Sequence, residues 1–433
     1  TRTRNVGGLV SALEPVLRRR EGMWLGWSGR TDAPSIHTSP GVDDQSSPHL
    51  AWIDFTPELH RDYYLGFCNR SLWRLFHSFP ARVRFTDQEW DAYVRGNELF
   101  AEAAMGLVRP DAPVWAHDYH LLLLAASMKR RGHRGPTGLF LHIPFPGADL
   151  FRMIPWSERL LEDLLAFDLL GFHTANDVSN FLQTVGFLSP ARVGDDVVLH
   201  RGRRIRVRAF PIGIVPENFG EGLTGEDARE AEDLIRSAGT VRLVIGVDRL
   251  DYTKGIPQRL DAFSRLLQLF PEWRGAISML QISVPSRADI PDYRDQRRLI
   301  EETVSRINHE YGRSDWTPVR YLYRSYSPAQ IARIYRSGRV AMVTPLRDGM
   351  NLVAKEFVAA QDPADPGVLL LSRFAGAASE LGDALMTNPY HIDGMARDLD
   401  RALRMGPEER AARHSKLRLA VQRTTAMTWA EDF

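Results

Sequence analysis

Cysteine is almost absent from this chain, which has only Cys68 among its 433 residues. A single cysteine excludes an intrachain disulfide and a cysteine-based metal cluster, and it is typical of proteins in a reducing compartment. A targeting segment is also not apparent, because Glu14 and Pro15 interrupt the first apolar stretch, which we interpret as an amphipathic helix. We therefore predict a cytoplasmic protein.

The chain also lacks an excess of charge of one sign and any long hydrophobic run. Its formal net charge is +1, so no overall field attracts nucleic acid or an acidic membrane surface. The longest apolar runs, such as LLLLAASM after His120, are far too short to span a bilayer. We expect neither nucleic acid nor a membrane as a partner, and any anion-binding site must be local.

Lysine is scarce too, because only four of the 55 Lys and Arg residues are lysine. One of them lies in VDRLDYTKG, residues 247–255, between an apolar run typical of a buried strand and a sequence with helical periodicity. Arg249 and Lys254 are thus expected where a strand ends. They could bind an anion there, or they could be ordinary solvated loop residues.

Short apolar runs alternate with helical sequence along most of the chain. This alternation predicts right-handed βαβ units and parallel sheets, and 433 residues suffice for two domains. We predict an α/β fold with two Rossmann-like domains facing each other across a cleft. The predicted boundaries are 1–212 for the first domain and 213–415 for the second, with a last segment at 416–433.

Polar residues recur at the points where the predicted strands end. Ligands bind at the carboxyl ends of the strands in open parallel sheets, so this placement predicts a polar binding site on each domain. The residues concerned are His117, Asp118, His120 and His142 in the first half, and Arg249, Lys254, Arg287, Arg347, Asp348 and Asn351 in the second.

The segment VTPLRDGMNLVAKEF, residues 343–357, predicts a strand, a glycine turn and a helix. The first amides of that helix, near Met350 to Leu352, lack intrahelical partners and suit an anion. Asp348 could accept hydrogen bonds from hydroxyl groups, or it could be a plain N-cap. Glu356 could bind a diol, or it could be an exposed helix carboxylate.

Five motifs, HDYH, HIPFP, RLDYTKG, SRADIPDY and TPLRDGMNLVAKE, occur in this order. With them the chain resembles the trehalose-6-phosphate synthase family, retaining glucosyltransferases of GT-B architecture, from the Gly7-Gly8 pair to Trp429. The resemblance implies glucosyl transfer from UDP-glucose or GDP-glucose to glucose 6-phosphate, giving α,α-trehalose 6-phosphate. It also implies a last helix that crosses back to the first domain, and a dimer or tetramer would suit the family.

On the donor side, the resemblance implies that Arg249 and Lys254 bind the diphosphate. It implies that His142 and Asp348 hold the donor glucose and that Glu356 binds the ribose hydroxyls. The complete set implied for the donor is Gly7, Gly8, His142, Arg249, Lys254, Asp348, Met350, Asn351, Leu352 and Glu356.

On the acceptor side, the resemblance implies that Asp118 faces the acceptor sugar. Tyr64 and Arg287 match positions that bind its phosphate, and Trp73 matches a further contact. Trp27 of GWSG is a weaker candidate. For Tyr64 and Trp73, packing as plain core aromatic residues is the alternative.

The resemblance supplies no carboxylate placed as a nucleophile, so it implies a same-face route without a covalent intermediate. In that route the leaving diphosphate helps to deprotonate the acceptor hydroxyl, while the protein positions the reactants and stabilises charge. The residues implied to be catalytic are Arg249, Lys254, Asp118 and His142.

No metal or other cofactor is expected. A metal site built from His117, His120 and His142 is conceivable, but a satisfied or substrate-facing histidine is the better interpretation. Lys355 is not required as a pyridoxal anchor, and we interpret it as a solvated residue or as part of a structural ion pair.

One departure from the family concerns the start of the chain. The family opens with a strand ending in an arginine that helps to bind the acceptor phosphate, whereas only six residues precede Gly7 here, so Arg4 is not a safe equivalent. Either the first strand is missing from this sequence, or the acceptor differs and is glycerol 3-phosphate or a cyclitol phosphate. A non-catalytic regulatory relative is a further alternative, disfavoured because the donor-site charges are all present.

Overall fold

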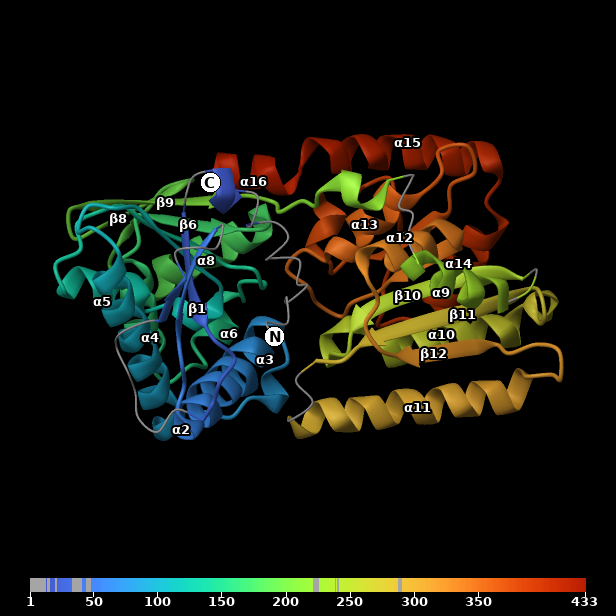
Figure 1. Cartoon of the computed structure of the whole chain (residues 1–433), viewed down its shortest axis with the longest axis horizontal. Helices are drawn as coiled ribbons and strands as arrows, with labels where there is room; N and C mark the ends of the chain where they lie inside the picture. The colour runs from blue at the N-terminus through green and yellow to red at the C-terminus, as the bar shows by residue number, and fades with distance from the viewer. Residues whose placement is uncertain are drawn as a thin grey trace. The chain divides into compact units, whose positions relative to one another are not determined.

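The structure is a computed structural model that describes residues 13, 16–19, 22–32, 41–43, 48–220, 226–237, 239, 241–286 and 290–433. The chain divides into two compact units, residues 1–211 with 429–433 and residues 212–428. Each unit contains a sheet with helices packed against it (Figure 1), which confirms the predicted α/β class. Gly7, Gly8 and Arg287 lie outside the described residues, so their roles stay predictions.

The main sheet of the first unit has the strand order β4-β5-β6-β9-β8-β7. The pairs β4·β5, β5·β6 and β6·β9 are parallel, while β8 pairs antiparallel with β9 and with β7. The two-residue turn between β8 and β9 uses Arg201 and Gly202, both at positive φ, as is common in tight β-hairpins. The strands are β4 (Val114–His117), β5 (Thr137–Phe140), β6 (Leu169–Phe172), β7 (Arg192–Val193), β8 (Val197–His200) and β9 (Arg203–Ala209).

A separate three-stranded sheet in the first unit was not predicted. In it β1 (Met23–Trp27) pairs parallel with β3 (His49–Ile53), and β2 (Gly41–Asp43) pairs antiparallel with β3. All but two of the residues in these strands are only partly buried or exposed, so the strands lack the continuous apolar run by which a buried strand is recognised.

The helices of the first unit include one of unusual type. The segment η1 (His60–Leu72) is a π-helix of 13 residues, a form that usually occurs as a single turn and often near functional sites. It runs directly into α3 (Trp73–Phe76). The other helical segments are α2 (Pro57–Leu59), η2 (Pro80–Arg82), α4 (Asp87–Leu107), η3 (Tyr119–Leu121), α5 (Leu124–Arg130), α6 (Ala148–Phe151), α7 (Ser157–Leu164) and α8 (Ala175–Leu188).

The second unit is built on a fully parallel sheet with the order β12-β11-β10-β13-β14-β15. Its inner strands are buried on both faces, as their apolar runs predicted, whereas the short β15 was not predicted. The strands are β10 (Arg242–Arg249), β11 (Ile277–Val284), β12 (Val319–Tyr323), β13 (Gly338–Val343), β14 (Val368–Ser372) and β15 (Leu385–Thr387).

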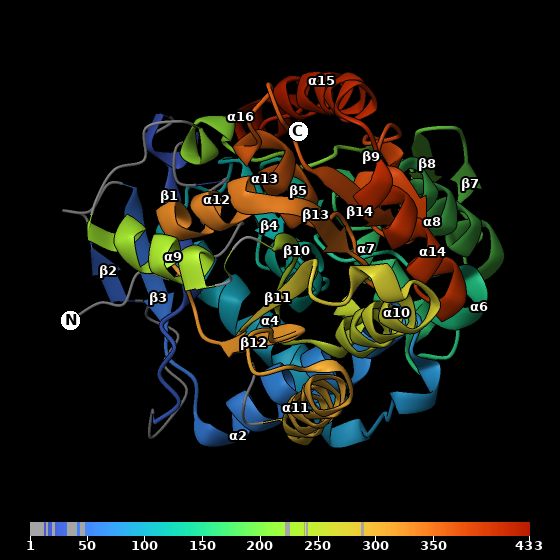
Figure 2. The ribbon, with the colours of Figure 1, turned by 90° about the vertical axis from the view of Figure 1, so that its right-hand side faces the viewer.

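Helices cover both faces of this sheet. One layer consists of α10 (Ile256–Leu269), α11 (Pro291–Tyr311) and α14 (Ile392–Arg404), and α10 packs against both other members. The other layer consists of α9 (Glu226–Ser237), α12 (Pro328–Ser337) and α13 (Leu352–Ala360), and Figure 2 shows the strands between the two layers. Among the described residues, none of the helices has the length and apolarity that a membrane span requires.

The C-terminal segment contributes to both units. Helix α15 (Pro407–Arg423) belongs to the second unit, while α16 (Ala426–Asp432) starts there and its last residues belong to the first. The Phe433 ring stacks on Trp115, with ring centroids 4.5 Å apart. A Cβ atom at Gly138 or Gly171 would lie 2.7 or 2.6 Å from that ring, so these two glycines make room for Phe433. The predicted boundaries at 212 and 415 stay predictions.

Candidate active site

The turn after β10 places the predicted diphosphate-binding residues. Arg249 is the exposed last residue of β10, and η5 (Tyr252–Lys254) follows. Asp251 caps η5 by accepting from the Thr253 amide at 3.0 Å. Gly255 has a φ of +64°, and a Cβ atom there would lie 2.4 Å from the Thr344 carbonyl oxygen. Only glycine fits this position, so the turn fixes where Lys254 stands.

A buried ion pair that we did not predict supports this turn. Arg259 is 0% exposed, and it donates to the Asp248 carboxylate at 2.5 Å. It also donates to Gln281 and Thr344 at 3.0 Å, and to the Lys254 carbonyl at 3.4 Å. Burial raises the pKa of Asp248, which the Arg259 charge opposes. Removing one partner would leave an unpaired buried charge, so the network holds the backbone beneath Lys254.

The sequence did contain a signal for this network. The helix IPQRLDAFSRLLQL buries apolar residues on one face, and Arg259 lies among them. A cation on a buried helix face requires a buried acceptor. The strand that precedes this helix contains an acidic residue, Asp248, which could serve as that acceptor.

Three predicted donor residues converge within the second unit. Lys254 Nζ lies 2.5 Å from Asp348 Oδ2, and Asn351 Nδ2 donates to the same oxygen at 3.0 Å. Both charged side chains are nearly buried, at 12% and 13% exposed. Asn351 Oδ1 is a buried acceptor that has no hydrogen-bond partner among the described residues. The cluster therefore offers a cation, a carboxylate and an unused amide oxygen at one place, which suits a phosphorylated sugar.

Backbone contacts hold the RDGMN loop in this position. Asp348 accepts at its carbonyl from the Gly376 amide at 3.1 Å, and Met350 accepts from the Ala377 amide at 2.8 Å. A Cβ atom at Gly376 would lie 1.8 Å from the Gly349 oxygen, so the two backbones meet as closely as glycine allows. Helix α13 then begins at Leu352, with Asn351 and not Asp348 at its N-cap position.

Glu356 is half-buried on α13. Burial raises the pKa of its carboxyl group to about 7, and a hydrogen bond from the Tyr335 hydroxyl at 3.1 Å opposes that rise. The carboxyl group thus titrates near neutral pH, which is a common property of functional sites.

In the first unit, Asp118 follows β4 with a strained backbone. Its φ of 71° and ψ of 175° fall in a region that residues other than glycine rarely adopt. The Asp118 carboxylate accepts from the His142 amide at 3.1 Å, and the Asp118 amide donates to the Phe140 carbonyl at 2.8 Å. The ends of β4 and β5 are thereby joined, and the two predicted substrate-facing residues are neighbours.

The His142 ring lies next to a second histidine, His117. Their Nε2 and Nδ1 atoms are 3.1 Å apart, and His173 lies 3.1 Å from the His142 carbonyl. Burial lowers the pKa of His117 to about 3 and that of His142 well below its usual value. Both rings are therefore neutral at pH 7, and His142 can exchange hydrogen bonds with a hydroxyl group without adding charge.

Aromatic rings gather around the predicted acceptor residues of the first unit. The half-buried Tyr64 ring stacks between His60 and His120, with centroids 5.6 and 5.7 Å away, and Trp27 lies 5.1 Å from it. Trp73 is only 5% exposed and packs against His77 and Tyr119. The structure brings Trp27 and Tyr64 together. The burial of Trp73 agrees with its alternative as a core aromatic residue.

The positions of the histidines and of Lys355 bear on two alternative chemistries, a metal site and a pyridoxal anchor. Among the residues that the structure describes, no three His, Cys, Asp or Glu side chains are grouped as metal ligands. Lys355 is 1% exposed and lies 2.6 Å from Glu380, so it forms a structural ion pair and the solvated interpretation is wrong. It also donates to the Ile212 carbonyl at 2.8 Å.

Comparison with known proteins identifies the family of this chain. The sequence profile of glycosyltransferase family 20 matches residues 1–433. A trehalose-6-phosphate synthase of Cronobacter sakazakii is 40% identical over 437 residues, which cover 99% of this chain and 90% of that protein.

Solved structures agree in fold. One is a UDP-forming trehalose-phosphate synthase of Burkholderia xenovorans in complex with glucose-6-phosphate, with a TM-score of 0.94 at 38% identity. The match covers 100% of this chain and 97% of the Burkholderia chain. An E. coli structure bound with UDP-2-fluoro glucose has a TM-score of 0.95 at 38% identity. The match covers 100% of this chain and 96% of the E. coli chain.

Proposed function

Because the chain belongs to glycosyltransferase family 20, we propose that it transfers glucose from a nucleoside-diphosphate glucose to glucose 6-phosphate, giving α,α-trehalose 6-phosphate. The observation that carries this proposal is the Lys254, Asp348 and Asn351 cluster, which combines groups for a phosphate and for sugar hydroxyls. The relatives described as UDP-forming favour UDP-glucose over GDP-glucose as the donor.

The proposed mechanism is same-face transfer with retention and without a covalent intermediate. Charge develops on the leaving diphosphate, and Arg249 and Lys254 at the end of β10 stabilise it. Lys254 forms an ion pair with Asp348, so a diphosphate that binds Lys254 provides it with a second anionic partner. Asp348 then accepts from glucose hydroxyls, and Glu356 accepts from the ribose hydroxyls.

On the acceptor side, the proposal places Asp118 and His142 at the reacting sugars and Tyr64 at the acceptor phosphate. The neutral His142 ring and the strained Asp118 backbone support this placement, because such features concentrate at sites that hold substrates. Arg287 completes the acceptor-phosphate site in the proposal. No metal or other cofactor takes part in it.

Location and assembly belong to the same proposal. We place the protein in the cytoplasm, together with the nucleotide sugar and the sugar phosphate that it would use. The single cysteine is compatible with such a reducing compartment. A dimer or a tetramer stays a prediction that sedimentation would decide.

The test is release of nucleoside diphosphate from UDP-glucose and from GDP-glucose, each with glucose 6-phosphate, with glycerol 3-phosphate and without acceptor. We expect release that requires glucose 6-phosphate, together with a non-reducing disaccharide phosphate as product. If release required glycerol 3-phosphate and did not occur with glucose 6-phosphate, glycerol 3-phosphate would be the acceptor. Donor binding without release under every condition would favour a regulatory relative.

Lysine variants provide the matched control. Lys254→Ala should abolish most of the release, whereas Lys416→Ala should not change it, because the Lys416 side chain is 67% exposed and pairs with Asp383 on the surface at 3.1 Å. Equal activity of the two variants would exclude Lys254 from the donor site.

A further inference from the structure

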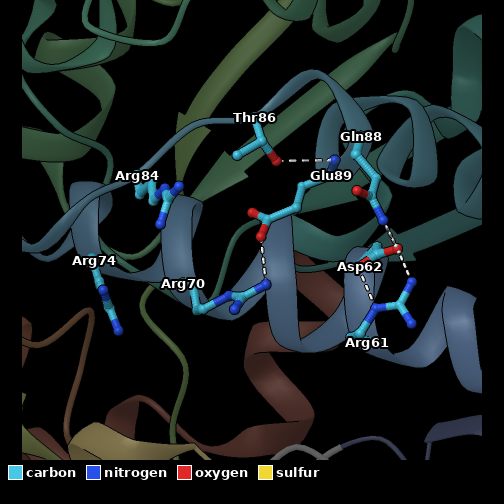
Figure 3. Close-up of a pocket in the computed structure, with 8 residues that line it drawn as sticks. All are labelled: Arg61, Asp62, Arg70, Arg74, Arg84, Thr86, Gln88 and Glu89. Atoms are coloured by element: carbon cyan, nitrogen blue, oxygen red, sulfur yellow. Dashed lines mark hydrogen bonds and ion pairs between the residues drawn. The ribbon is translucent and has the colours of Figure 1, made fainter.

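A polar pocket lies entirely within the first unit, apart from the donor cluster of the second unit. Its volume is about 470 Å³, which is in the range of small-molecule sites. Figure 3 shows that most of its lining comes from η1 and from the segment that leads into α4. The lining residues are Arg61, Asp62, Arg70, Arg74, Arg84, Thr86, Gln88 and Glu89. We call this site the arginine pocket.

The π-helix places the arginines of this pocket on one side. Arg61 and Arg70 are nine residues apart, which is roughly two turns of a helix with i→i+5 hydrogen bonds. Tyr64 and Trp73 are also nine residues apart, but each follows Arg61 or Arg70 by three residues. They therefore lie on another side of the same helical segment. The arginine pocket is therefore distinct from the aromatic cluster around Tyr64.

The carboxylates of the pocket are too few to neutralise all of its guanidinium groups. Asp62 accepts two hydrogen bonds from Arg61, at 2.8 and 2.7 Å, and Glu89 pairs with Arg70. Four guanidinium groups against two carboxylates leave a net charge of +2.

Two groups in the pocket have unused hydrogen-bonding capacity. Arg70 Nε is buried and has no acceptor among the described residues. Arg84 is exposed, and its backbone carbonyl accepts a hydrogen bond from the Ser71 hydroxyl at 2.6 Å. Its guanidinium group acts on Glu89 through its charge, but it forms no hydrogen bond or ion pair within the part of the chain that the structure describes. A buried donor without an acceptor is costly, and an anionic ligand would satisfy it.

We propose that the arginine pocket binds a small molecule that carries two or more phosphate groups. Guanidinium groups form two parallel hydrogen bonds to a phosphate, and they do so better than lysine. Arg70 on the helix and Arg84 on the following segment approach the pocket from different elements, so one ligand with separate phosphates can contact both (Figure 3). The proposal does not depend on the reaction proposed above.

The test is calorimetric titration of the full chain with inorganic triphosphate, with orthophosphate as a second probe. Triphosphate could also bind at the donor cluster, so the titration is repeated with Lys254→Ala. Arg84→Gln is the main variant, because Arg84 is exposed and the buried Glu89 near it keeps its ion pair with Arg70. Arg109→Gln is the matched control, since Arg109 is an exposed arginine of the same unit outside the pocket.

We expect Arg84→Gln to weaken triphosphate binding roughly tenfold, as for loss of one charged hydrogen-bonding group. Lys254→Ala and Arg109→Gln should keep the binding, and orthophosphate should bind much more weakly. The double variant Arg70→Gln with Glu89→Gln, which removes both partners of that ion pair together, should weaken it further.

Three outcomes would overturn the proposal. Equal affinity of Arg84→Gln and Arg109→Gln would show that the pocket is not used. Loss in Lys254→Ala alone would assign the triphosphate to the donor cluster. Orthophosphate binding as tightly as triphosphate would exclude a preference for several phosphate groups.

Discussion

At the scale of single residues, the Lys254 and Asp348 pair shows how the donor cluster balances its own charges. A lysine buried this far would be costly if it were alone, and Asp348 removes that cost. The two residues are 94 positions apart in sequence, and the neighbouring strands β10 and β13 bring them together. Motif recognition supplied the residue types, but only the strand order supplied the contact.

Arg249 is the first residue to test. We expect Arg249→Ala to lower kcat by roughly 10²–10³, because a preorganised cation acts mainly where charge develops in the transition state. Diphosphate release at saturating donor would measure it. Arg242→Ala, at the opposite end of β10, is the control and should leave kcat unchanged. An Arg249→Ala enzyme with full kcat and only a higher donor KM would contradict the charge-stabilising role.

Glu356 predicts a pH dependence of donor binding. Its pKa of about 7 means that the carboxylate fraction rises about tenfold between pH 6 and pH 8. The ionised form accepts hydrogen bonds from two ribose hydroxyls, so donor KM should fall by up to about tenfold over this interval. Glu356→Gln should show a flat profile, and Glu408→Gln, an exposed carboxyl variant on α15, should keep the wild-type one.

The same group affects stability with a defined sign. Its pKa is raised from 4.5 in the unfolded chain to about 7 in the folded protein, so the folded state holds an extra proton between these values. Stability contributed by this group therefore falls as pH rises from 4.5 to 7. Urea unfolding of wild type and Glu356→Gln should diverge across that window, and parallel curves would show that the carboxyl group is not perturbed.

At the scale of elements, the β10–η5–α10 turn depends on one glycine. Gly255→Ala would place a Cβ atom against the Thr344 oxygen in a left-handed backbone, and we expect a loss of about 1–3 kcal/mol in unfolding free energy with a higher donor KM. Urea titration and donor kinetics measure both effects. Gly382→Ala is the control, because a Cβ atom there meets nothing within 4 Å. Equal stability of the two variants would mean that the turn can shift at no cost.

How far the elements were predictable depended on burial. The strands β10, β11, β13 and β14 are buried on both faces and appear in the sequence as continuous apolar runs. The half-buried β1 and β3 and the three-residue β15 carry no such pattern. The π-helix η1 was also beyond prediction, since a periodicity of 3.6 residues is assumed when a helix is read from sequence.

Candidate residues for the site could be predicted from the sequence, but the contacts between them could not. The loop position of Asp348 followed from the motif, whereas its partner Lys254 and the support from Arg259 did not. The strained φ of Asp118 and the neutral His117–His142 pair also arise only when β4 and β5 are placed side by side.

At the scale of the whole molecule, the last residues of the chain complete the core of the first unit. Trp429 is 1% exposed and lies between Trp115 and Phe140, with ring centroids 5.1 and 4.9 Å away. We expect Trp429→Ala to cost about 3–5 kcal/mol of unfolding free energy, measured by far-ultraviolet circular dichroism in urea. Phe187→Ala, with a side chain 60% exposed, should change it by no more than about 0.5 kcal/mol. A similar small change in both variants would show that Trp429 is not needed in that core.

This arrangement has a consequence for synthesis on the ribosome. The first unit is translated up to Pro211, but Trp429 and Phe433 emerge only after the whole second unit has been made. At 5–20 residues per second, that interval is roughly 10–40 s. During it, the surface around Gly138 and Gly171 that later receives the Phe433 ring stays uncovered. The nascent first unit therefore waits with an open apolar face, and it is at this stage that a chaperone would have most to protect.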